Sequence, residues 1–184
     1  ILQAGLTGTS AGFIFASEDV TLDPTVMGHN VGIELAKRGY DVWMANNRGS
    51  KYGMGHSNPL LNSKTRAFWN FTWDDISQYD TTAIVDYVLG QTGESRLHFI
   101  GHSQGSAVMF ALLTQNQTVY NPKIASFTAV CPITRIGDAI TSFNPLVHFM
   151  APALELFNGE GPVFTEKFIS DSLFPLACDV TPMI

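Results

Sequence analysis

The chain alternates short, mostly apolar stretches with longer segments in which apolar residues recur every three or four positions. Residues 1–3, 41–45, 96–100 and 126–131 form the short stretches. Their length and their β-branched or aromatic content are typical of strands. The pattern predicts a strand at each of these four places.

Helical spacing separates these strands, and the first two predicted helices carry recognisable ends. The first helix precedes Lys37, Arg38 and Gly39, which place cations in its last turn and a glycine just past it. The second helix is capped by Thr72 and Asp75. Its apolar positions are Ile76, Tyr79, Ala83, Ile84, Tyr87 and Val88.

A third predicted helix begins directly after Ser103 and has hardly any polar face. We therefore expect it to be buried on most sides. Its apolar positions are Ala107, Val108, Phe110, Ala111 and Leu112.

Strands that alternate with helices indicate the α/β class, with a parallel sheet and helices on both faces. The alternation stops after Cys131, where short stretches rich in Pro and Phe follow. The sequence thus predicts an incomplete α/β core over residues 1–131. Residues 132–184 are expected to begin a helical cap or lid.

Composition narrows the function classes. The 184 residues fit one domain, and 45% of them are hydrophobic, as in a globular protein. The formal net charge is −6 and no Lys/Arg cluster offsets it, which argues against a nucleic-acid partner. No apolar stretch approaches the roughly 20 residues of a membrane-spanning helix. The chain begins at Ile1 without a signal-like segment and stops at Ile184, so it is expected to be a fragment.

No cofactor or metal site is expected from the glycines or the cysteines. Gly5, Gly8 and Gly12 match neither the dinucleotide fingerprint nor the phosphate-binding loop. Cys131 and Cys178 lack metal-ligand spacing, and Cys131 is expected to be a buried thiol.

The segment "GHSQG", residues 101–105, places Ser103 between a predicted strand and a predicted helix. A serine in such a tight turn exposes its Oγ above the sheet edge, and Gly101 and Gly105 supply the small residues that the turn requires. The pattern predicts that Ser103 is a nucleophile. A serine that merely lets a helix pack on a strand is the alternative.

Two backbone N–H groups are candidates for an oxyanion hole. Gln104 follows the serine at a helix N-terminus, where the dipole favours negative charge. Leu6 lies in the glycine-containing loop after the first strand, which supplies the second donor in such enzymes. His102 adjoins the serine in sequence and points away from it, so we expect a packed histidine and not the catalytic base.

Five stretches of the chain resemble the acid lipase family of α/β hydrolases, which includes gastric and lysosomal acid lipases. The resemblance covers nearly the whole chain. The stretches are "LQAGL", "AKRGYDVWMANNRGS", "FWNFTWDDISQYD", "YVLGQTGESRLHFIGHSQGS" and "AVCPITRI".

This resemblance implies a serine hydrolase of neutral-lipid esters, such as triacylglycerols or cholesteryl esters, acting at a lipid–water interface. Ser103 would be its nucleophile, with the amides of Leu6 and Gln104 as the oxyanion hole. The resemblance also implies a secreted or lysosomal setting, in which the sequons at Asn70 and Asn116 become glycosylation candidates. Two departures stand out, because Ala4 replaces the usual histidine and the usual tryptophan is replaced near Tyr52.

The catalytic aspartate and histidine are not expected within this chain. Family members carry them, in that order, after the cap. His148 is the one histidine after Ser103, and it lies in the predicted cap, as do Asp138, Asp171 and Asp179. Two alternatives remain, namely an inactive homologue with a lipid-binding or interaction role, and an esterase or peptidase on the same fold.

Overall fold

The computed structural model of the protein describes residues 1–14 and 30–134. Two compact units divide the chain. One contains Ile1–Gly55 and Phe71–Ile136, and the other contains His56–Asn70 and Gly137–Ile184. Of the predicted cap, only residues 132–134 are among the described residues, so the boundary predicted at residue 131 remains a prediction.

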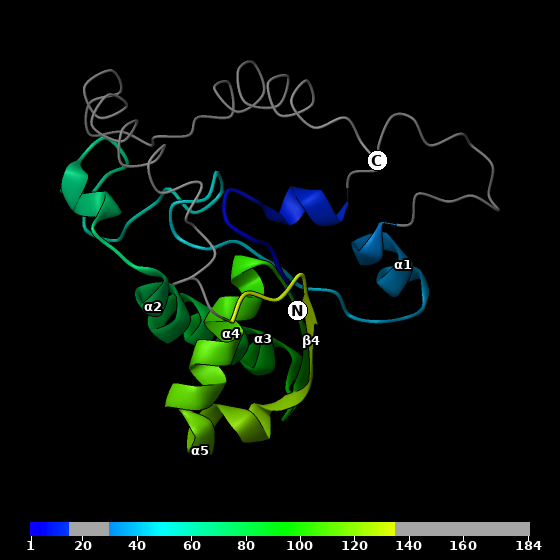
Figure 1. Ribbon diagram of the computed structural model, residues 1–184. Coiled ribbons are helices and arrows are strands. Elements are labelled where there is room, and N and C mark those ends of the chain that lie inside the picture. Colours follow the sequence, from blue (N-terminus) through cyan, green and yellow to red (C-terminus); the bar gives the residue numbers. More distant parts are fainter. Residues whose placement is uncertain (15–29, 135–184) are drawn as a thin grey trace, which may run out of the picture. The chain divides into compact units, whose positions relative to one another are not determined.

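The first unit contains a four-stranded parallel sheet in the order β2-β1-β3-β4. All four strands overlap the predicted stretches. Gly101 and His102 extend β3 beyond the predicted end because they pair with Ala129 and Val130 of β4, which Figure 1 shows at one edge of the sheet. The bounds are β1 Leu2–Gln3, β2 Met44–Ala45, β3 Leu97–His102 and β4 Ile124–Val130.

The helices confirm the three helical predictions, and Gly39 ends the first helix as predicted, whereas its cap at Asn30 was not predicted. Asn30 caps the first helix by accepting from the N–H of Gly32, and Gly39 follows that helix with a φ of 87°. The α-helices are α1 Val31–Lys37, α2 Trp73–Asp75, α3 Thr82–Thr92, α4 Gln104–Gln115 and α5 Gln117–Tyr120. The 3-10 helices are η1 Ser10–Phe13, η2 Arg66–Trp69 and η4 Asn121–Lys123.

The second predicted helix contains a π-helical turn, η3 Ile76–Thr81, between α2 and α3. Thr72 and Asp75 form the predicted capping box in front of it. Within η3, the fully buried Ser77 donates its hydroxyl to the carbonyl of Val108 in α4, at 2.8 Å. The wider turn therefore makes direct contact with the helix that follows Ser103.

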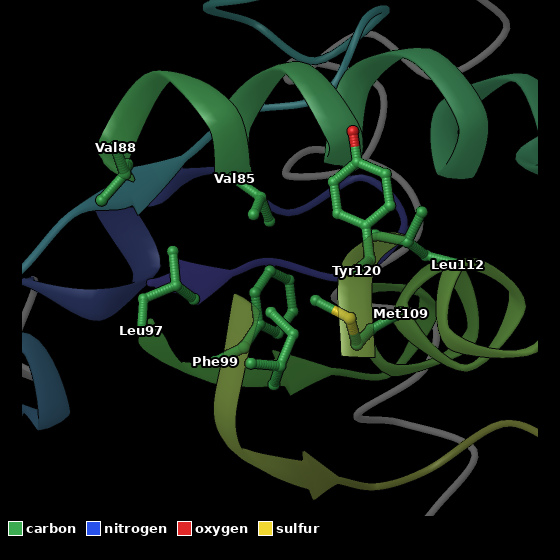
Figure 2. Packing of buried hydrophobic residues seen from close by; sticks show 8 residues of the cluster. Val85, Val88, Leu97, Phe99, Met109, Leu112 and Tyr120 are labelled. Carbon is green, nitrogen blue, oxygen red and sulfur yellow. The ribbon is translucent and has the colours of Figure 1, made fainter. Parts of the chain in front are cut away.

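The main hydrophobic core lies between the sheet and the helices α3 and α4 (Figure 2). Phe99 of β3 and Met109 of α4 have no exposed surface. Burial of such side chains contributes roughly 1.5–3 kcal/mol each. The cluster comprises Val85, Val88, Leu97, Phe99, Met109, Leu112, Tyr120 and Ile124.

Helices lie on both faces of the sheet, as predicted. Strand register puts Gln3 and Gly101 on the face of α4, where Gly105 packs closely against both. Met44 lies on the opposite face, and a Cβ built on Gly32 of α1 would be 3.5 Å from its sulfur.

The expectation that Cys131 is buried is wrong, since its side chain is exposed. The strand β4 ends at Val130, and Cys131 follows with a φ of 48°, so it leaves the sheet before its side chain can enter the core. Cys178 lies outside the described residues.

In the second unit, residues 56–70 are described. Phe68 packs edge-on against Trp69 with ring centroids 5.0 Å apart, and the indole N–H of Trp69 donates to the carbonyl of Ser63 at 2.8 Å. These contacts order the segment locally around η2.

Candidate active site

Ser103 occupies the junction between β3 and α4 with a φ of 52° and a ψ of −117°. Positive φ is uncommon for a residue other than glycine, and such strain is concentrated at functional sites. Its N–H donates to the carbonyl of Val130 at the end of β4, at 2.9 Å. The sheet edge therefore holds the serine in a conformation that it would not adopt alone.

Glycines make this junction sterically possible, in agreement with the sequence analysis. A Cβ built on Gly101 would lie 2.5 Å from the carbonyl oxygen of Gly105. A Cβ built on Gly105 would lie 2.5 Å from the carbonyl oxygen of Gln3. Neither position has room for a side chain, so strand β1, strand β3 and helix α4 approach one another at backbone distance.

The loop after β1 reaches the serine directly. A Cβ built on Gly5 would lie 2.9 Å from the Cβ of Ser103. The N–H of Gly8 donates to the carbonyl of Gly5 at 3.0 Å, and Thr7 has a φ of 62°, so the loop folds into a tight turn. Next to Gly5, the side chain of Leu6 is 70% exposed.

The two predicted oxyanion donors both lie next to residues of the serine turn. Gln104 is the first residue of α4, and Leu6 follows the glycine that contacts Ser103. Within residues 1–14 and 30–134, no acceptor is bonded to either N–H group. Both N–H groups are thus available to a ligand. The N–H of Gln104 lies at the N-terminus of α4, where the helix dipole favours a developing negative charge.

A buried polar pair links the end of β1, just before the loop that contains Gly5, to the segment that follows β2. The amide of Gln3, which has no exposed surface, donates to Oδ1 of Asn47 at 2.8 Å. The Oε1 atom of Gln3 has no hydrogen-bond partner among the described residues. Sequence reasoning missed this pair, because Gln3 falls inside an apolar stretch and a buried amide has no periodic signature.

Arg48 ties the loop after β2 to the π-helical turn. Its backbone N–H and its Nε both donate to the carboxylate of Asp80, at 2.8 and 2.7 Å, and its Nη2 lies 2.6 Å from Oδ1. The guanidinium also lies over the rings of Phe71 and Tyr79, 5.8 and 5.7 Å from their centroids. This clamp fixes the end of the segment that contains Asn47.

His102 is exposed, so the expectation of a packed histidine is wrong. Alternation along β3 explains this, since Leu97, Phe99 and Gly101 face the core and His102 faces the other way. Its Nδ1 is 3.2 Å from the position of a Cβ on Gly5. Among the described residues, no side chain is hydrogen-bonded to Oγ of Ser103. His148, Asp138, Asp171 and Asp179 lie outside them.

The two sequons differ in their surroundings. Asn70 is exposed, whereas Asn116 is half-buried at the end of α4, where its N–H donates to Leu112 at 2.9 Å. Ala4, the departure noted in the sequence, is buried beside Gly8.

Among the described residues, no helix has the length and apolar character needed to cross a bilayer.

Comparison with known proteins places these features in a family context. The sequence model of the alpha/beta hydrolase fold matches residues 21–180. Lipase 1 of Drosophila melanogaster is 37% identical over 171 residues, which cover 87% of this chain and 35% of that protein.

Two further relatives come from cattle and from a plant. Gastric triacylglycerol lipase of Bos taurus is 31% identical over 175 residues, covering 94% of this chain and 40% of the lipase. Triacylglycerol lipase 2 of Arabidopsis thaliana is 36% identical over 140 residues, covering 75% of this chain and 32% of that protein. The chain therefore spans about a third of the length of the curated relatives that it matches.

Proposed function

The chain belongs to the α/β hydrolase fold family, where it resembles the acid lipases, and from this premise we propose that it carries the nucleophile half of a serine hydrolase of lipid carboxylic esters. One observation carries the proposal. Ser103 has a φ of 52° between β3 and α4, with the loop at Gly5 in van der Waals contact with it. Relatives named as lipases support the choice of ester substrates.

In the proposed reaction, Oγ of Ser103 attacks the carbonyl carbon of the ester and its proton passes to a histidine base. The carbonyl oxygen becomes an oxyanion, to which the N–H groups of Leu6 and Gln104 donate. Collapse of this intermediate breaks the bond to the alcohol, which leaves with the proton, and the acyl group stays on Oγ. Water then releases the fatty acid by the same steps, with the histidine again accepting and returning a proton.

The histidine and its aspartate are proposed to lie outside this chain. Without a neutral imidazole beside Oγ, deprotonation of the serine is unfavourable. We therefore expect the 184-residue chain alone to have little or no turnover, and the full-length gene product to have full activity.

An exposed apolar side chain beside the site supports an apolar acyl chain as part of the substrate. Leu6 exposes 70% of its surface directly beside the glycine that contacts Ser103. We propose triacylglycerols or cholesteryl esters, presented at a lipid–water interface, as the substrates. The same resemblance supports a secreted or lysosomal protein with glycans on Asn70 and Asn116.

The test compares Ser103→Ala with Ser126→Ala in the full-length gene product. Ser126 is an exposed serine of β4, bonded to His98 at 2.7 Å and remote from the turn. We expect Ser103→Ala to abolish hydrolysis of emulsified triolein and labelling by an alkyl phosphonate, while Ser126→Ala retains both. Unchanged hydrolysis by Ser103→Ala would refute the proposal. An inactive but folded wild-type protein would favour the non-enzymatic homologue, and a preference for soluble short-chain esters or peptides would favour the other hydrolases.

A further inference from the structure

The hydroxyl of Ser106 has a function that neither the family match nor the relatives' names assign. Ser106 lies one turn into α4 and has no exposed surface. Its Oγ donates to the carbonyl oxygen of Ser103 at 2.5 Å. The same Oγ accepts from the N–H of Ile133, in the segment after β4, at 3.2 Å. Because it both donates and accepts, the hydroxyl is held in one orientation.

The carbonyl that Ser106 contacts belongs to the same peptide group as the N–H of Gln104. In a planar trans peptide, the carbonyl oxygen and the N–H point in opposite directions. Three donors converge on the Ser103 carbonyl, namely the N–H of Ser106 at 2.9 Å, the N–H of Ala107 at 3.3 Å and the Ser106 hydroxyl. They hold that oxygen towards the helix, and the N–H of Gln104 is thereby directed away from it.

We infer that Ser106 is a positioning residue, which orients the Ser103–Gln104 peptide so that the Gln104 N–H is aimed at the oxyanion. Through its bond from the N–H of Ile133, Ser106 also links that orientation to the segment after β4. The inference rests on the proposed function, because it concerns the second donor of the proposed oxyanion hole. The helical N–H groups alone leave the peptide freer to tilt, since the N–H of Ala107 is the most distant of the three donors. The hydroxyl removes this freedom before substrate arrives, which is the preorganisation that oxyanion stabilisation requires.

The chain contains a matched control for this role. Ser77 is also fully buried, and its hydroxyl also donates to a carbonyl of α4, that of Val108 at 2.8 Å. Ser77→Ala and Ser106→Ala therefore remove the same chemical group from equally buried positions against one helix. Only Ser106→Ala changes the peptide next to the nucleophile.

The experiment measures kcat and KM for a soluble p-nitrophenyl ester, and the affinity for an alkylboronic acid, in the full-length protein. Oγ of the nucleophile bonds to boron, and the tetrahedral adduct resembles the intermediate of ester hydrolysis. We expect Ser106→Ala to lower kcat and boronic-acid affinity by about tenfold each, less than the 10²–10³ that follows loss of a donor itself. KM should change little, and Ser106→Thr should recover part of the loss. Ser77→Ala should leave kcat and boronic-acid affinity within about twofold of wild type, while its Tm falls by about as much as that of Ser106→Ala.

Equal losses of kcat and affinity in Ser77→Ala and Ser106→Ala would overturn the inference, because a structural role alone would produce them. Wild-type kcat and affinity in Ser106→Ala would also overturn it. If Ser106→Ala fails to fold, Ser106→Cys replaces it, because a thiol is similar in size to a hydroxyl and a much weaker donor. Losses equal to those of Ser77→Ala, or wild-type kcat and affinity, would again overturn the inference. Loss of activity in Ser103→Ala is established first, so failure of the proposed function is seen separately.

Discussion

Gly5 approaches Ser103 so closely that a Cβ on the glycine would lie 2.9 Å from the Cβ of the serine. This contact joins the loop after β1 to the turn after β3, which are almost one hundred residues apart in the sequence. In the proposed oxyanion hole, both backbones must keep this distance so that the N–H groups of Leu6 and Gln104 reach the same oxyanion.

Gly5→Ala should therefore impair catalysis more than folding. The added methyl group would lie 2.9 Å from the Cβ of Ser103, closer than side-chain carbons approach one another, so the loop has to shift. A misplacement of about 1 Å near reacting atoms can cost about 10² in rate, and a smaller shift costs less. We expect kcat to fall at least tenfold in an ester assay, with a decrease in Tm of only a few degrees. Gly12→Ala is the control, because a Cβ on Gly12 has no neighbour within 4 Å. Equal activity in the two variants would contradict the prediction.

Gly105→Ala should strongly destabilise the packing of α4 on the sheet. Its Cβ would lie 2.5 Å from the carbonyl oxygen of Gln3 and 2.9 Å from that of Ala4, and backbone atoms cannot yield as side chains do. Such overpacking is expected to cost about 3 kcal/mol or more. The converse control is Gly90→Ala in α3, where a Cβ is unobstructed and should stabilise the helix by about 0.5–1 kcal/mol. Urea unfolding of both variants measures the two changes.

Arg48→Lys should weaken the clamp between Arg48 and Asp80, although the positive charge is retained. A lysine has no Nε–H and no planar fork, so it loses the paired contacts to the carboxylate and the ring stacking. We expect the free energy of unfolding to decrease by about 1–3 kcal/mol, because Asp80 is only 13% exposed and keeps part of its desolvation cost. Lys37→Met, which breaks the exposed pair with Glu34, should change it by less than about 0.5 kcal/mol. Similar losses in both variants would argue against the clamp.

Acid should weaken the capping box in front of the π-helical turn. Hydrogen bonds from the backbone N–H and the hydroxyl of Thr72 lower the pKa of Asp75 below its usual value. Since the folded-state pKa is the lower one, the stabilisation is complete above the usual aspartate pKa near 4 and is lost as the pH falls through the folded value. Unfolding of wild type and Asp75→Asn, followed from pH 7 down to pH 2, should show a stability difference that shrinks below about pH 4. Asp74→Asn, at the neighbouring exposed position, is the control, and a pH-independent difference for Asp75→Asn would refute the account.

Local patterns predicted most of this architecture because they arise from local physics. Strand-length apolar runs, the Thr72 cap and the glycine after α1 each depend on neighbours in the sequence, and each was located correctly. The turn at Ser103 was also predictable, because only glycines permit such close packing around it.

Contacts between distant segments were not predictable in the same way. The bond from Gln3 to Asn47 and the bridge from Ser103 through Ser106 to Ile133 depend on strand order and loop course, which no periodicity encodes. Cys131 was misjudged because its residue type favours burial, and His102 because it was placed from its position beside the serine. The end of β4 and the alternation of β3 put both side chains at the surface.

The π-helical turn at Ile76–Thr81 sets the rotational phase of everything that follows it in α3. Each residue of an α-helix advances the side-chain direction by about 100°, and a π turn accommodates one residue more than an α turn. Deleting one residue here would rotate Val85 and Val88 away from the sheet while Ser77 stayed on α4. The extra residue thus lets one continuous helix present two differently oriented faces, so this short segment should tolerate substitution far better than any change in its length.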